Sequence, residues 1–388
     1  MKAPQLLILA DDLTGAADTA GYFARAGLQT LVRFAPGKGA PAEVLALSTH
    51  SRHLSPDEAA QAQHRALAEL GEVGGAEWIY KKVDSTLRGH PAAELQAIMV
   101  ALGSTRALIA PAFPQQGRTT VEGRQLVEGQ PLEQTSFGGN SDLLDLFAQA
   151  EYPVWHLGLD TVRRGGEELG SALTAEGLYV GDAQGEEDLR CLVQGAAEAG
   201  IRLLCGSAGL ARALQERALL HSVLPAPALP EWDAGPVLVV AGSRHPLTLR
   251  QVQALGQAGA LILGLGSASC EQAQRALGDG RDVVLHSAGL ESGDPETVAS
   301  GLALMAREII SASPVGGLVL TGGDIALAVC AALESTGMWL HGEVEPGIPW
   351  GTLADGPWAG LRVVTKAGGF GSEGSLVQAV QLLRHRQS

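Results

Sequence analysis

The feature that most constrains the fold is a run of five apolar residues, Leu6 to Ala10, that ends in two aspartates, Asp11 and Asp12. An apolar run of this length between polar residues is typical of a buried strand in a parallel sheet. Thr14-Gly15 and a helical pattern follow, so both carboxylates are predicted at the carboxyl end of a strand, where open α/β sheets bind ligands. Either aspartate could instead cap the next helix. Adjacent carboxylates raise each other's pKa, however, which favours a cation, a hydroxyl proton or a metal as their partner.

A second stretch repeats this arrangement further along the chain. The apolar run Trp78 to Tyr80 leads into a polar turn from Lys82 to Gly89 that contains Asp84, Ser85 and Arg88, and a helical pattern follows. Cations and hydroxyls at a strand end suit a small ligand that is both anionic and hydroxylated. A solvated turn with incidental charges is the alternative, but the shared topology of the two stretches favours a common binding site.

Because the net charge of the chain is negative, an anionic ligand must be attracted by individual cations near its site. A formal charge of -15 argues against nucleic acid or an anionic membrane as a partner. The same acidic field cannot draw in an anionic substrate, which raises the importance of Lys82, Arg88 and Arg118. Arg52 belongs with them, because it follows the predicted strand Glu43 to Leu47 in a polar turn. A surface ion pair is the alternative role for Arg52.

Length and element order predict two α/β domains. A chain of 388 residues exceeds one ordinary domain, and apolar residues at 46% suffice for two cores. Strand and helix patterns alternate in both halves, which predicts two doubly wound α/β domains. In the first half these include a strand at 28–34 and a hairpin or long loop at 119–134. The predicted boundaries are 1–222 for the first domain, 223–236 for a proline-rich linker and 237–388 for the second domain.

The cysteines and the hydropathy indicate the cellular setting. The four cysteines are widely spaced, which predicts buried thiols in a reducing compartment rather than disulfides or zinc ligands. No apolar run approaches the ~20 residues of a membrane span, and the N-terminal residues show no signal-peptide pattern. These features predict a soluble cytoplasmic protein.

Three glycine turns in the second half are candidates for binding phosphate. Gly242-Ser243, Gly322-Gly323-Asp324-Ile325 and the segment Gly368 to Gly374 each lie between a predicted strand and a predicted helix. Glycine lets backbone N–H groups approach a phosphate closely, and the helix dipole favours negative charge. One such turn is more often structural, but three in one domain favour nucleotide binding.

Other nucleotide and phosphate motifs are excluded. The chain contains no Gly-Lys-Ser/Thr, so a P-loop is absent. Gly369 to Gly374 matches the dinucleotide fingerprint letter for letter, but no strand with a ribose-binding acidic residue ~20 positions on follows it. Asp11-Asp12-Leu13 is unlike the aspartyl-phosphate phosphatases, whose second aspartate would stand at the position of Leu13.

Together these motifs resemble the signatures of the four-carbon acid sugar kinase family. The resemblance rests on Ala10 to Ala16 and on Lys82 to Gly89. It spans nearly the whole chain in the family's order and is specific for the family, although it does not settle the substrate. The other matching segments are Pro111–Pro114, Gly117–Thr119, Gly129–Leu132, Ala241–Ser243, Leu320–Asp324, Pro346–Trp350 and Lys366–Gly371.

The resemblance implies an ATP-dependent kinase that phosphorylates the terminal hydroxyl of a threonate, erythronate or 3-oxo-tetronate type of acid in an interdomain cleft, with Mg²⁺ accompanying the nucleotide. The first domain would bind the acid and the second ATP. Asp12 is the preferred general base, with Asp11 or Asp84 in reserve, and Lys82 or Arg88 would neutralise the moving phosphoryl group. The predicted catalytic residues are Asp12, Lys82 and Asp84. The predicted substrate-binding residues are Asp11, Asp12, Arg52, Lys82, Val83, Asp84, Ser85 and Arg88. The predicted nucleotide-binding residues are Ser243, Gly322, Gly323, Asp324, Ile325, Gly368 and Gly371.

Two features depart from the family's pattern. His50 stands before Arg52 where the family usually has an acidic or amide-bearing pattern, and the segment Thr135 to Ser141 is shortened. The alternative functions are a phosphatase or lyase acting on sugar acids with the same fold, and a non-catalytic sugar-acid-binding protein. The sequence does not determine the oligomeric state, and a homodimer is one option.

Overall fold

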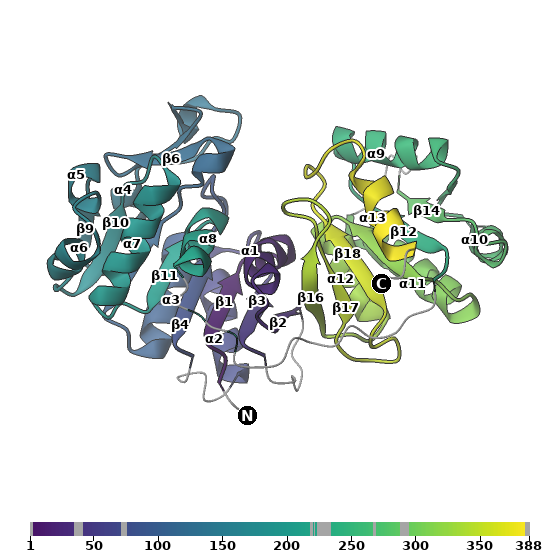
Figure 1. The fold of residues 1–388 in the computed structure, drawn as a ribbon, viewed down its shortest axis with the longest axis horizontal. Helices are drawn as coiled ribbons and strands as arrows, with labels where there is room; N and C mark the ends of the chain where they lie inside the picture. The colour runs from purple at the N-terminus through teal and green to yellow at the C-terminus, as the bar shows by residue number, and fades with distance from the viewer. Residues whose placement is uncertain are drawn as a thin grey trace. The chain divides into compact units, whose positions relative to one another are not determined.

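The chain forms two compact units, each with an α/β fold (Figure 1). The computed structural model describes residues 3–34, 42–70, 76–217, 220, 222, 234–266, 269–287 and 295–384. The first unit comprises Met1–Gln29 and Lys38–Pro225, and the second comprises Thr30–Gly37 and Ala226–Ser388.

The first unit contains a parallel sheet in the order β3-β1-β4-β11-β5-β10-β9, with β1 between β3 and β4. All five residues of β1 are buried, as the unbroken apolar run predicts for a strand covered on both faces. The bounds are β1 (Leu6–Ala10), β3 (Val44–Ser48), β4 (Trp78–Lys82), β5 (Arg106–Ala110), β9 (Val154–Leu157), β10 (Gly177–Gly181) and β11 (Leu203–Gly206).

Helices cover both faces of this sheet. One face packs on α3, where Leu7 and Leu9 join Leu95 and Ile98 in a core, and the other face packs on α1, α7 and α8. The bounds are α1 (Leu13–Arg25), α2 (Pro56–Glu69), α3 (Pro91–Leu102), α4 (Leu143–Ala148), α5 (Leu159–Val162), α6 (Gly166–Ala172), α7 (Glu186–Glu198) and α8 (Ala208–Glu216), with short 3-10 turns at Pro114–Gln116 and Leu132–Gln134.

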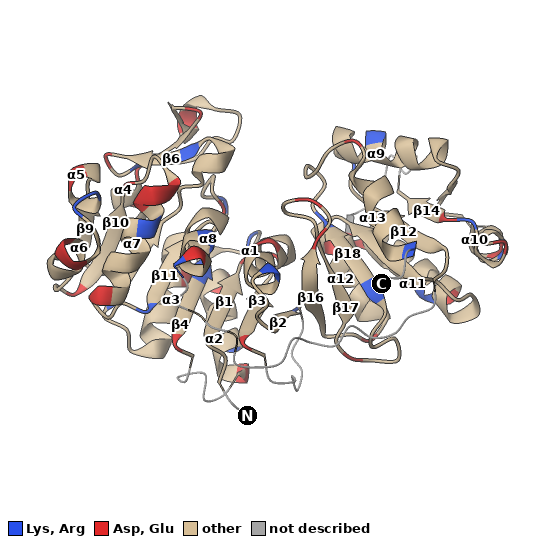
Figure 2. Cartoon of the chain, in the orientation of Figure 1, with Lys and Arg blue, Asp and Glu red and all other residues tan. Residues whose placement is uncertain are grey.

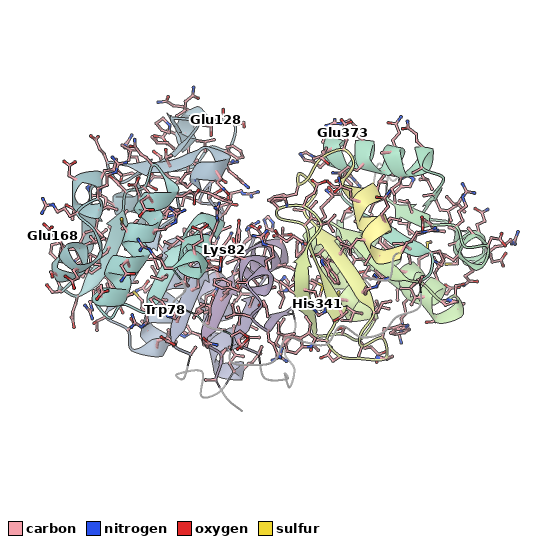
Figure 3. All side chains as sticks on the ribbon, in the orientation of Figure 1. Trp78, Lys82, Glu128, Glu168, His341 and Glu373 are labelled. Carbon is pink, nitrogen blue, oxygen red and sulfur yellow. The ribbon has the colours of Figure 1, made fainter. Side chains whose placement is uncertain are left out.

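Strand β4 shows how alternation assigns neighbouring side chains to opposite faces. Side chains of successive strand residues point to opposite sides of a sheet. Lys81 reaches Glu94 of α3, whereas Lys82 lies beside Gly15 of α1 on the other face. Figure 3 shows Trp78 and Lys82 at the two ends of β4.

A small antiparallel sheet follows β5, where the sequence predicts a hairpin or a long loop. It consists of β6 (Arg118–Val121), β7 (Arg124–Val127) and β8 (Gln130–Pro131). The buried Asp182 carboxylate accepts hydrogen bonds from the N–H groups of Glu122 and Gly123, at 2.8 and 2.9 Å. The hairpin prediction is therefore confirmed, and its turn is anchored to the end of β10.

The sheet of the second unit is parallel in one part and antiparallel in the other. Strands β13-β14-β12-β15-β18 are parallel, and β17, β16 and β2 extend them with antiparallel pairs. The strands are β2 (Thr30–Arg33), β12 (Val237–Ala241), β13 (Leu261–Gly264), β14 (Val283–His286), β15 (Gly317–Thr321), β16 (Gly337–Glu343), β17 (Pro349–Leu353) and β18 (Arg362–Lys366). The helices are α9 (Pro246–Gln257), α10 (Ser269–Gly278), α11 (Pro295–Ala312), α12 (Gly323–Ala332) and α13 (Ser375–Arg384).

Two details differ from the sequence-based expectations. The predicted strand at 28–34 is β2, and it pairs with β16 of the second unit. The antiparallel strands β16 and β17 were not predicted, because no helix separates them and local patterns favour strand-helix alternation. The proline-rich linker predicted at 223–236 lies almost entirely outside the described residues.

The remaining expectations concern membranes, cysteines and charge. Among the described residues, no helix has both the length and the apolar character needed to cross a membrane. Cys191, Cys205, Cys270 and Cys330 are all free thiols, and burial raises the pKa of Cys205 and of Cys330 to about 12. Figure 2 shows acidic and basic residues interspersed along the helices of each unit in this view.

Candidate active site

The polar turns of the first unit meet because their strands end at the same level. Ala10 is in register with Ser48 of β3 and with Lys82 of β4. The backbone N–H groups of Thr49 and Ser51 donate to the carbonyls of Ala10 and Asp11, at 2.8 and 3.0 Å. These bonds hold the turn after β3 against the end of β1, and so bring Arg52 to the two aspartates.

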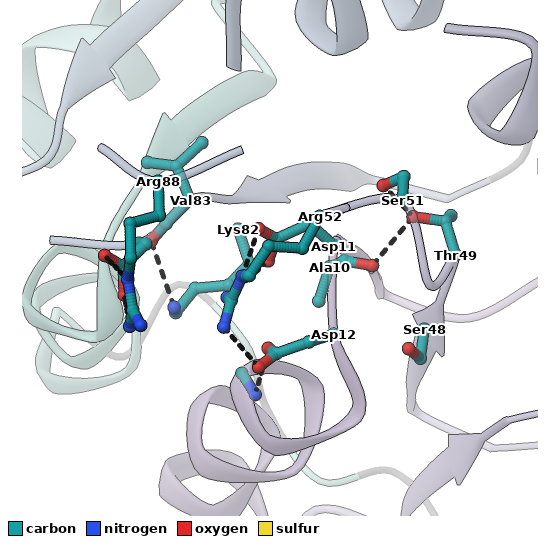
Figure 4. A network of polar contacts seen from close by, with 12 residues as sticks. Ala10, Asp11, Asp12, Ser48, Thr49, Ser51, Arg52, Lys82, Val83 and Arg88 are labelled. Carbon is teal, nitrogen blue, oxygen red and sulfur yellow. Dashed lines mark hydrogen bonds and ion pairs between the residues drawn. The ribbon is translucent and has the colours of Figure 1, made fainter. Parts of the chain in front are cut away.

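Arg52 bridges both carboxylates, as Figure 4 shows. Its Nε and Nη2 donate to the two oxygens of Asp11 at 2.9 and 2.8 Å, and its Nη1 donates to Asp12 at 2.6 Å. The side chain of Arg52 is 15% exposed, so the alternative of a surface ion pair is wrong. The paired charges also explain how two adjacent carboxylates remain together at a strand end.

Asp12 has a second role as the cap of helix α1. One of its carboxylate oxygens accepts from the N–H of Gly15 at 2.7 Å. The capping interpretation is therefore correct for Asp12, but the cap uses only one oxygen of the carboxylate. The Asp12 side chain is 29% exposed against 2% for Asp11, so it is the more accessible of the two to a ligand.

The environment of Asp11 keeps it ionised. Burial alone would raise the pKa of Asp11, but hydrogen bonds from Arg52 and the charges of Lys81, Arg52 and Lys82 outweigh burial, and the net shift is downward. A buried carboxylate with a lowered pKa is a poor proton acceptor. Its position suits it to orient Arg52.

Lys82 points toward the first turn of α1. A Cβ added to Gly15 would lie 3.4 Å from Nζ of Lys82, so the glycine leaves room for this ammonium group. The described contact of Nζ is with the carbonyl of Val83, at 3.0 Å (Figure 4). With only part of its three-donor capacity used, the lysine can bind an anionic group.

The turn after β4 is held by a second carboxylate–guanidinium pair. Asp84 accepts two hydrogen bonds from Arg88, each at 2.9 Å, and one from the N–H of Thr86 at 3.1 Å. Burial alone would raise the pKa of Asp84, but Arg88, Lys82 and Thr86 lower it well below its usual range. Ser85 lies in the same turn, and its carbonyl accepts from Nε2 of Gln125 at 2.8 Å.

Two supports of this site were missed by the sequence analysis. Gln125 is fully buried in β7 and ties the small sheet to the Ser85 turn. On the other face of the main sheet, the buried Lys81 pairs with Glu94 at 2.8 Å, and Glu94 also accepts from Ser51. The adjacent lysines on a strand were the available signal, because strand alternation places one of them on the opposite face.

In the second unit, the predicted phosphate turns also follow strands that end together. Ala241 is in register with Thr321, and Thr321 with Lys366. The turns fit closely: a Cβ on Gly368 would lie 2.1 Å from Oγ of Ser243 and a Cβ on Gly242 would lie 2.2 Å from Ile325. The structure thus brings Ser243, Ile325 and Gly368 together.

Helix α12 has an N-terminus that no side chain caps. Gly322 occupies the cap position with φ of 99° and makes no side-chain hydrogen bond to the helix, whereas α1 and α9 are capped by Asp12 and His245. The N–H groups of the first helical turn, which include those of Gly323, Asp324 and Ile325, have no partner within the helix. Such a terminus suits a phosphate oxygen.

The last predicted turn is shaped by a neighbouring carboxylate. Gly371 has φ of 83°, and the next residue, Ser372, donates its N–H and its hydroxyl to Glu345 at 2.9 and 2.8 Å. Burial alone would raise the pKa of Glu345, but its hydrogen bonds from Ser372 and Ser375 lower it. Glu345 therefore fixes this turn as an ionised acceptor.

The described residues contain no group of three or more His, Cys, Asp or Glu side chains arranged to hold a metal. Mg²⁺ in phosphoryl transfer usually takes one or two carboxylates and completes its shell with water and phosphate oxygens. The exposed Asp324 at the start of α12 meets that smaller requirement.

Comparison with family models divides the chain in the same way as the two sets of turns. Residues 6–214 match a sugar-binding N-terminal domain, and residues 238–376 match a nucleotide-binding C-terminal domain. The Asp11, Asp12 and Arg52 cluster lies within the first match, and the glycine turns lie within the second.

Curated relatives agree with this assignment. The chain is 36% identical to a D-threonate kinase of Salmonella typhimurium, with 97% of both chains covered, and 38% identical to one of Cupriavidus necator at the same coverage. A D-erythronate kinase of Heliobacterium modesticaldum is 30% identical, again over 97% of each chain.

The fold is shared with a Salmonella typhimurium protein described as a putative tRNA synthase, at a TM-score of 0.84 and 24% identity over 99% of this chain and 100% of that one. The two domain matches and the relatives' identities over nearly the full length show that the chain belongs to the four-carbon acid sugar kinase family.

Proposed function

We propose that this protein transfers the γ-phosphoryl group of ATP to the terminal hydroxyl of a four-carbon sugar acid, with D-threonate as the first candidate. The observation that carries the proposal is the cluster at the ends of β1, β3 and β4, where Arg52 joins Asp11 and Asp12 beside Lys82. D-threonate comes first because two relatives at 36% and 38% identity are D-threonate kinases.

Asp12 is the best candidate for the general base among the three carboxylates. Asp11 and Asp84 each receive two hydrogen bonds from one guanidinium, and the pKa of each is lowered. Asp12 receives a single bond from Arg52 and keeps part of its carboxylate exposed. It would take the proton from the attacking hydroxyl while that oxygen bonds to the γ-phosphorus and the bond to ADP breaks.

The cations of the first unit would bind the charged end of the acid and the transferred group. Arg52 presents a planar fork that matches a carboxylate, and Arg88 is 58% exposed beside the Ser85 turn. Lys82, a compact ammonium with unused donor capacity, would neutralise charge on the moving phosphoryl group. Val83 is held in this turn by its carbonyl bond to Lys82.

The second unit would bind ATP through backbone amides. Support comes from the uncapped start of α12 and from the close approach of Gly368 to Ser243. Mg²⁺ bound to the nucleotide would neutralise phosphate charge, and Asp324 would be its nearest carboxylate at this helix terminus. In-line transfer requires acid and nucleotide to meet, so the predicted interdomain cleft remains part of the proposal.

The test is a panel of four-carbon acids with ATP and Mg²⁺, in which ADP and the phosphorylated acid are both quantified. D-threonate, D-erythronate and 3-oxo-tetronates would be compared by kcat/KM. The expected result is one phosphorylated acid per ADP, with D-threonate preferred. ADP release without a phosphorylated acid, or acid consumption that does not require ATP, would instead indicate a hydrolase, a phosphatase or a lyase.

A further inference from the structure

Lys366 is a buried lysine at the point where β18 enters the glycine loop 367–374. Its side chain is almost fully enclosed, with the residue 3% exposed. Its Nζ donates to the carbonyl oxygens of Ala367, Gly368 and Phe370, at 2.7, 3.1 and 3.2 Å. A lysine ammonium has three N–H donors, and these three carbonyls are its shortest contacts; the hydroxyl of Thr248 lies further away, at 3.5 Å.

These contacts determine where the N–H groups of the loop point. In a trans peptide the C=O and the following N–H point in opposite directions, and the described residues contain no cis peptide bond. The carbonyls of Ala367, Gly368 and Phe370 point at Nζ, so the N–H groups of Gly368, Gly369 and Gly371 point away from it. In the described part of the chain, none of these three N–H groups donates to a protein acceptor.

Neighbouring side chains of α9 bind the same carbonyl side of the loop. Thr248 donates its hydroxyl to the carbonyl of Gly368 at 2.8 Å, and the buried Gln251 donates Nε2 to the carbonyls of Phe370 and Ser372, at 3.2 and 2.6 Å. The carbonyl side of the loop is thus saturated with donors. A set of free N–H groups on the other side is the arrangement that binds anions.

We propose that Lys366 is a built-in cation that holds the glycine loop in its anion-binding conformation, and that it positions the triphosphate through the loop rather than by touching it. The inference rests on the proposed nucleotide site of the second unit. It differs from the role of a P-loop lysine, which reaches the phosphates directly, because the loop carbonyls are the closest partners of Lys366.

The role requires the charged form of the lysine. Burial lowers the pKa of Lys366 to about 8, and the Glu345 carboxylate opposes this shift. Other titratable or charged groups around the loop are His245, next to Gly369, and the exposed Arg250–Glu373 ion pair. Loss of a proton leaves two donors for three carbonyls, so ATP affinity should decline as the pH rises through about 8.

The experiment compares K366M with R362M in the full chain, using calorimetric titration with ATP and Mg²⁺ and, separately, with D-threonate. Arg362 is the matched control: it begins the same strand, is 2% exposed, and donates to the carbonyls of Leu382 and Leu383 at the far end of α13. K366M should weaken ATP binding at least tenfold and leave acid binding within about twofold, whereas R362M should change neither by more than about threefold. Both variants lose a buried hydrogen-bonded cation, so thermal unfolding of each shows whether stability alone explains the loss.

The dependence of ATP affinity on pH distinguishes this role from a purely structural one, which would not change the affinity in this pH range. Between about pH 7.5 and 9.5, where lysines with a lowered pKa titrate, the affinity of the wild type for ATP should fall and that of K366M should stay flat. Equal losses of ATP affinity in K366M and R362M, or the same pH profile for wild type and K366M, would overturn the role of Lys366. If the wild type binds neither ATP nor inorganic tripolyphosphate, the nucleotide assignment itself fails, and the inference fails with it.

Discussion

At the end of β1 the polar groups are charged side chains that bind one another, whereas the loop after β18 carries backbone N–H groups, those of Gly368, Gly369 and Gly371, that donate to no acceptor in the described chain. Arg52 is shared between Asp11 and Asp12. The start of α12, by contrast, has no side-chain cap, and the carbonyls of the glycine loop are turned toward Lys366. The two sites therefore prepare for an anion in different ways.

The difference suits the two ligands. A sugar acid that binds Arg52 must compete with carboxylates already in place, so the net gain in affinity is small but a wrongly shaped acid is rejected. A triphosphate that binds fixed N–H groups displaces only water, and the cost of arranging those groups was met during folding. Ligand binding in the first unit should therefore be most sensitive to the loss of individual side chains. Ligand binding in the second unit should be most sensitive to changes in backbone shape.

The largest effect is expected for Asp12→Asn. Asparagine caps a helix as well as aspartate does, so α1 should persist while the proton acceptor is lost. Turnover should fall by at least ~100-fold, the scale of general-base catalysis, and ATP affinity should not change. Steady-state kinetics and ATP titration would measure the two quantities.

A matched control for this change is Asp160→Asn, an exposed residue of α5. It should keep normal turnover. Full activity of Asp12→Asn would remove Asp12 from the mechanism and return the choice of base to Asp11 or Asp84.

The next prediction contrasts two adjacent lysines of β4, one expected to support stability and the other expected to support activity. Lys81→Met leaves the buried Glu94 without its cationic partner, and breaking a buried ion pair costs about 3–5 kcal/mol of unfolding free energy. Lys82→Met should instead reduce kcat/KM and change stability by less than about 1 kcal/mol. Denaturant unfolding and kinetics of both variants would test whether the two faces of one strand have these separate roles.

The double variant Lys81→Met with Glu94→Gln supplies the internal check. It removes the unpaired charge and keeps an oxygen that accepts from Ser51 and Gln63. It should regain at least half of the lost stability. If the double variant is as unstable as Lys81→Met alone, packing rather than charge accounts for the loss.

Much of the fold and the position of the candidate site followed from local patterns. The run Leu6 to Ala10 is a fully buried strand, and its two aspartates lie at its carboxyl end, since five consecutive apolar residues leave few other structures open. The glycine turns likewise follow strands that end in register. Strand ends are predictable because polar residues and glycines interrupt the apolar run at the place where the chain turns.

What the sequence could not reveal depends on long-range pairing. Strand β2 reads as an ordinary strand of the first half, yet its partner is β16, about three hundred residues away in the sequence. Gln125 gave no signal either, because its role depends on the small sheet lying against the Ser85 turn. Lys366 was visible only as part of a motif, and its three carbonyl acceptors could be found only from the path of the loop.

A smaller effect is expected for Gly368→Val, which tests the backbone site. A Cβ at this position would lie 2.1 Å from Oγ of Ser243 and 3.2 Å from Cβ of His245, so the loop must shift. Overpacking of this kind costs about 1–3 kcal/mol, and ATP affinity should fall about tenfold with acid binding unchanged. Gly278→Ala, on the open side of α10, should leave both affinities intact. Loss of acid binding in Gly368→Val would mean that the two ligands are assigned to the wrong units.

The smallest effect concerns how the free energy of unfolding changes at acidic pH, and it compares wild type with Arg52→Met. The pKa of Asp11 is lowered in the folded protein despite burial, chiefly through hydrogen bonds from Arg52. A carboxyl group with a lowered folded pKa adds stability above its ordinary pKa of 3.8 and loses it as the pH falls through the folded value. Lys81 and Lys82 still offset the charge of Asp11 when Arg52 is removed, so Arg52→Met should be only about 1 kcal/mol less stable than wild type near neutral pH, and the gap should narrow below about pH 4. Urea unfolding at both pH values measures the gap, with Arg163→Met as the control for an exposed guanidinium paired with a carboxylate. A gap that stays constant with pH would show that Arg52 stabilises the turn by packing, and that the charges at the end of β1 are held in place by the fold rather than by one another.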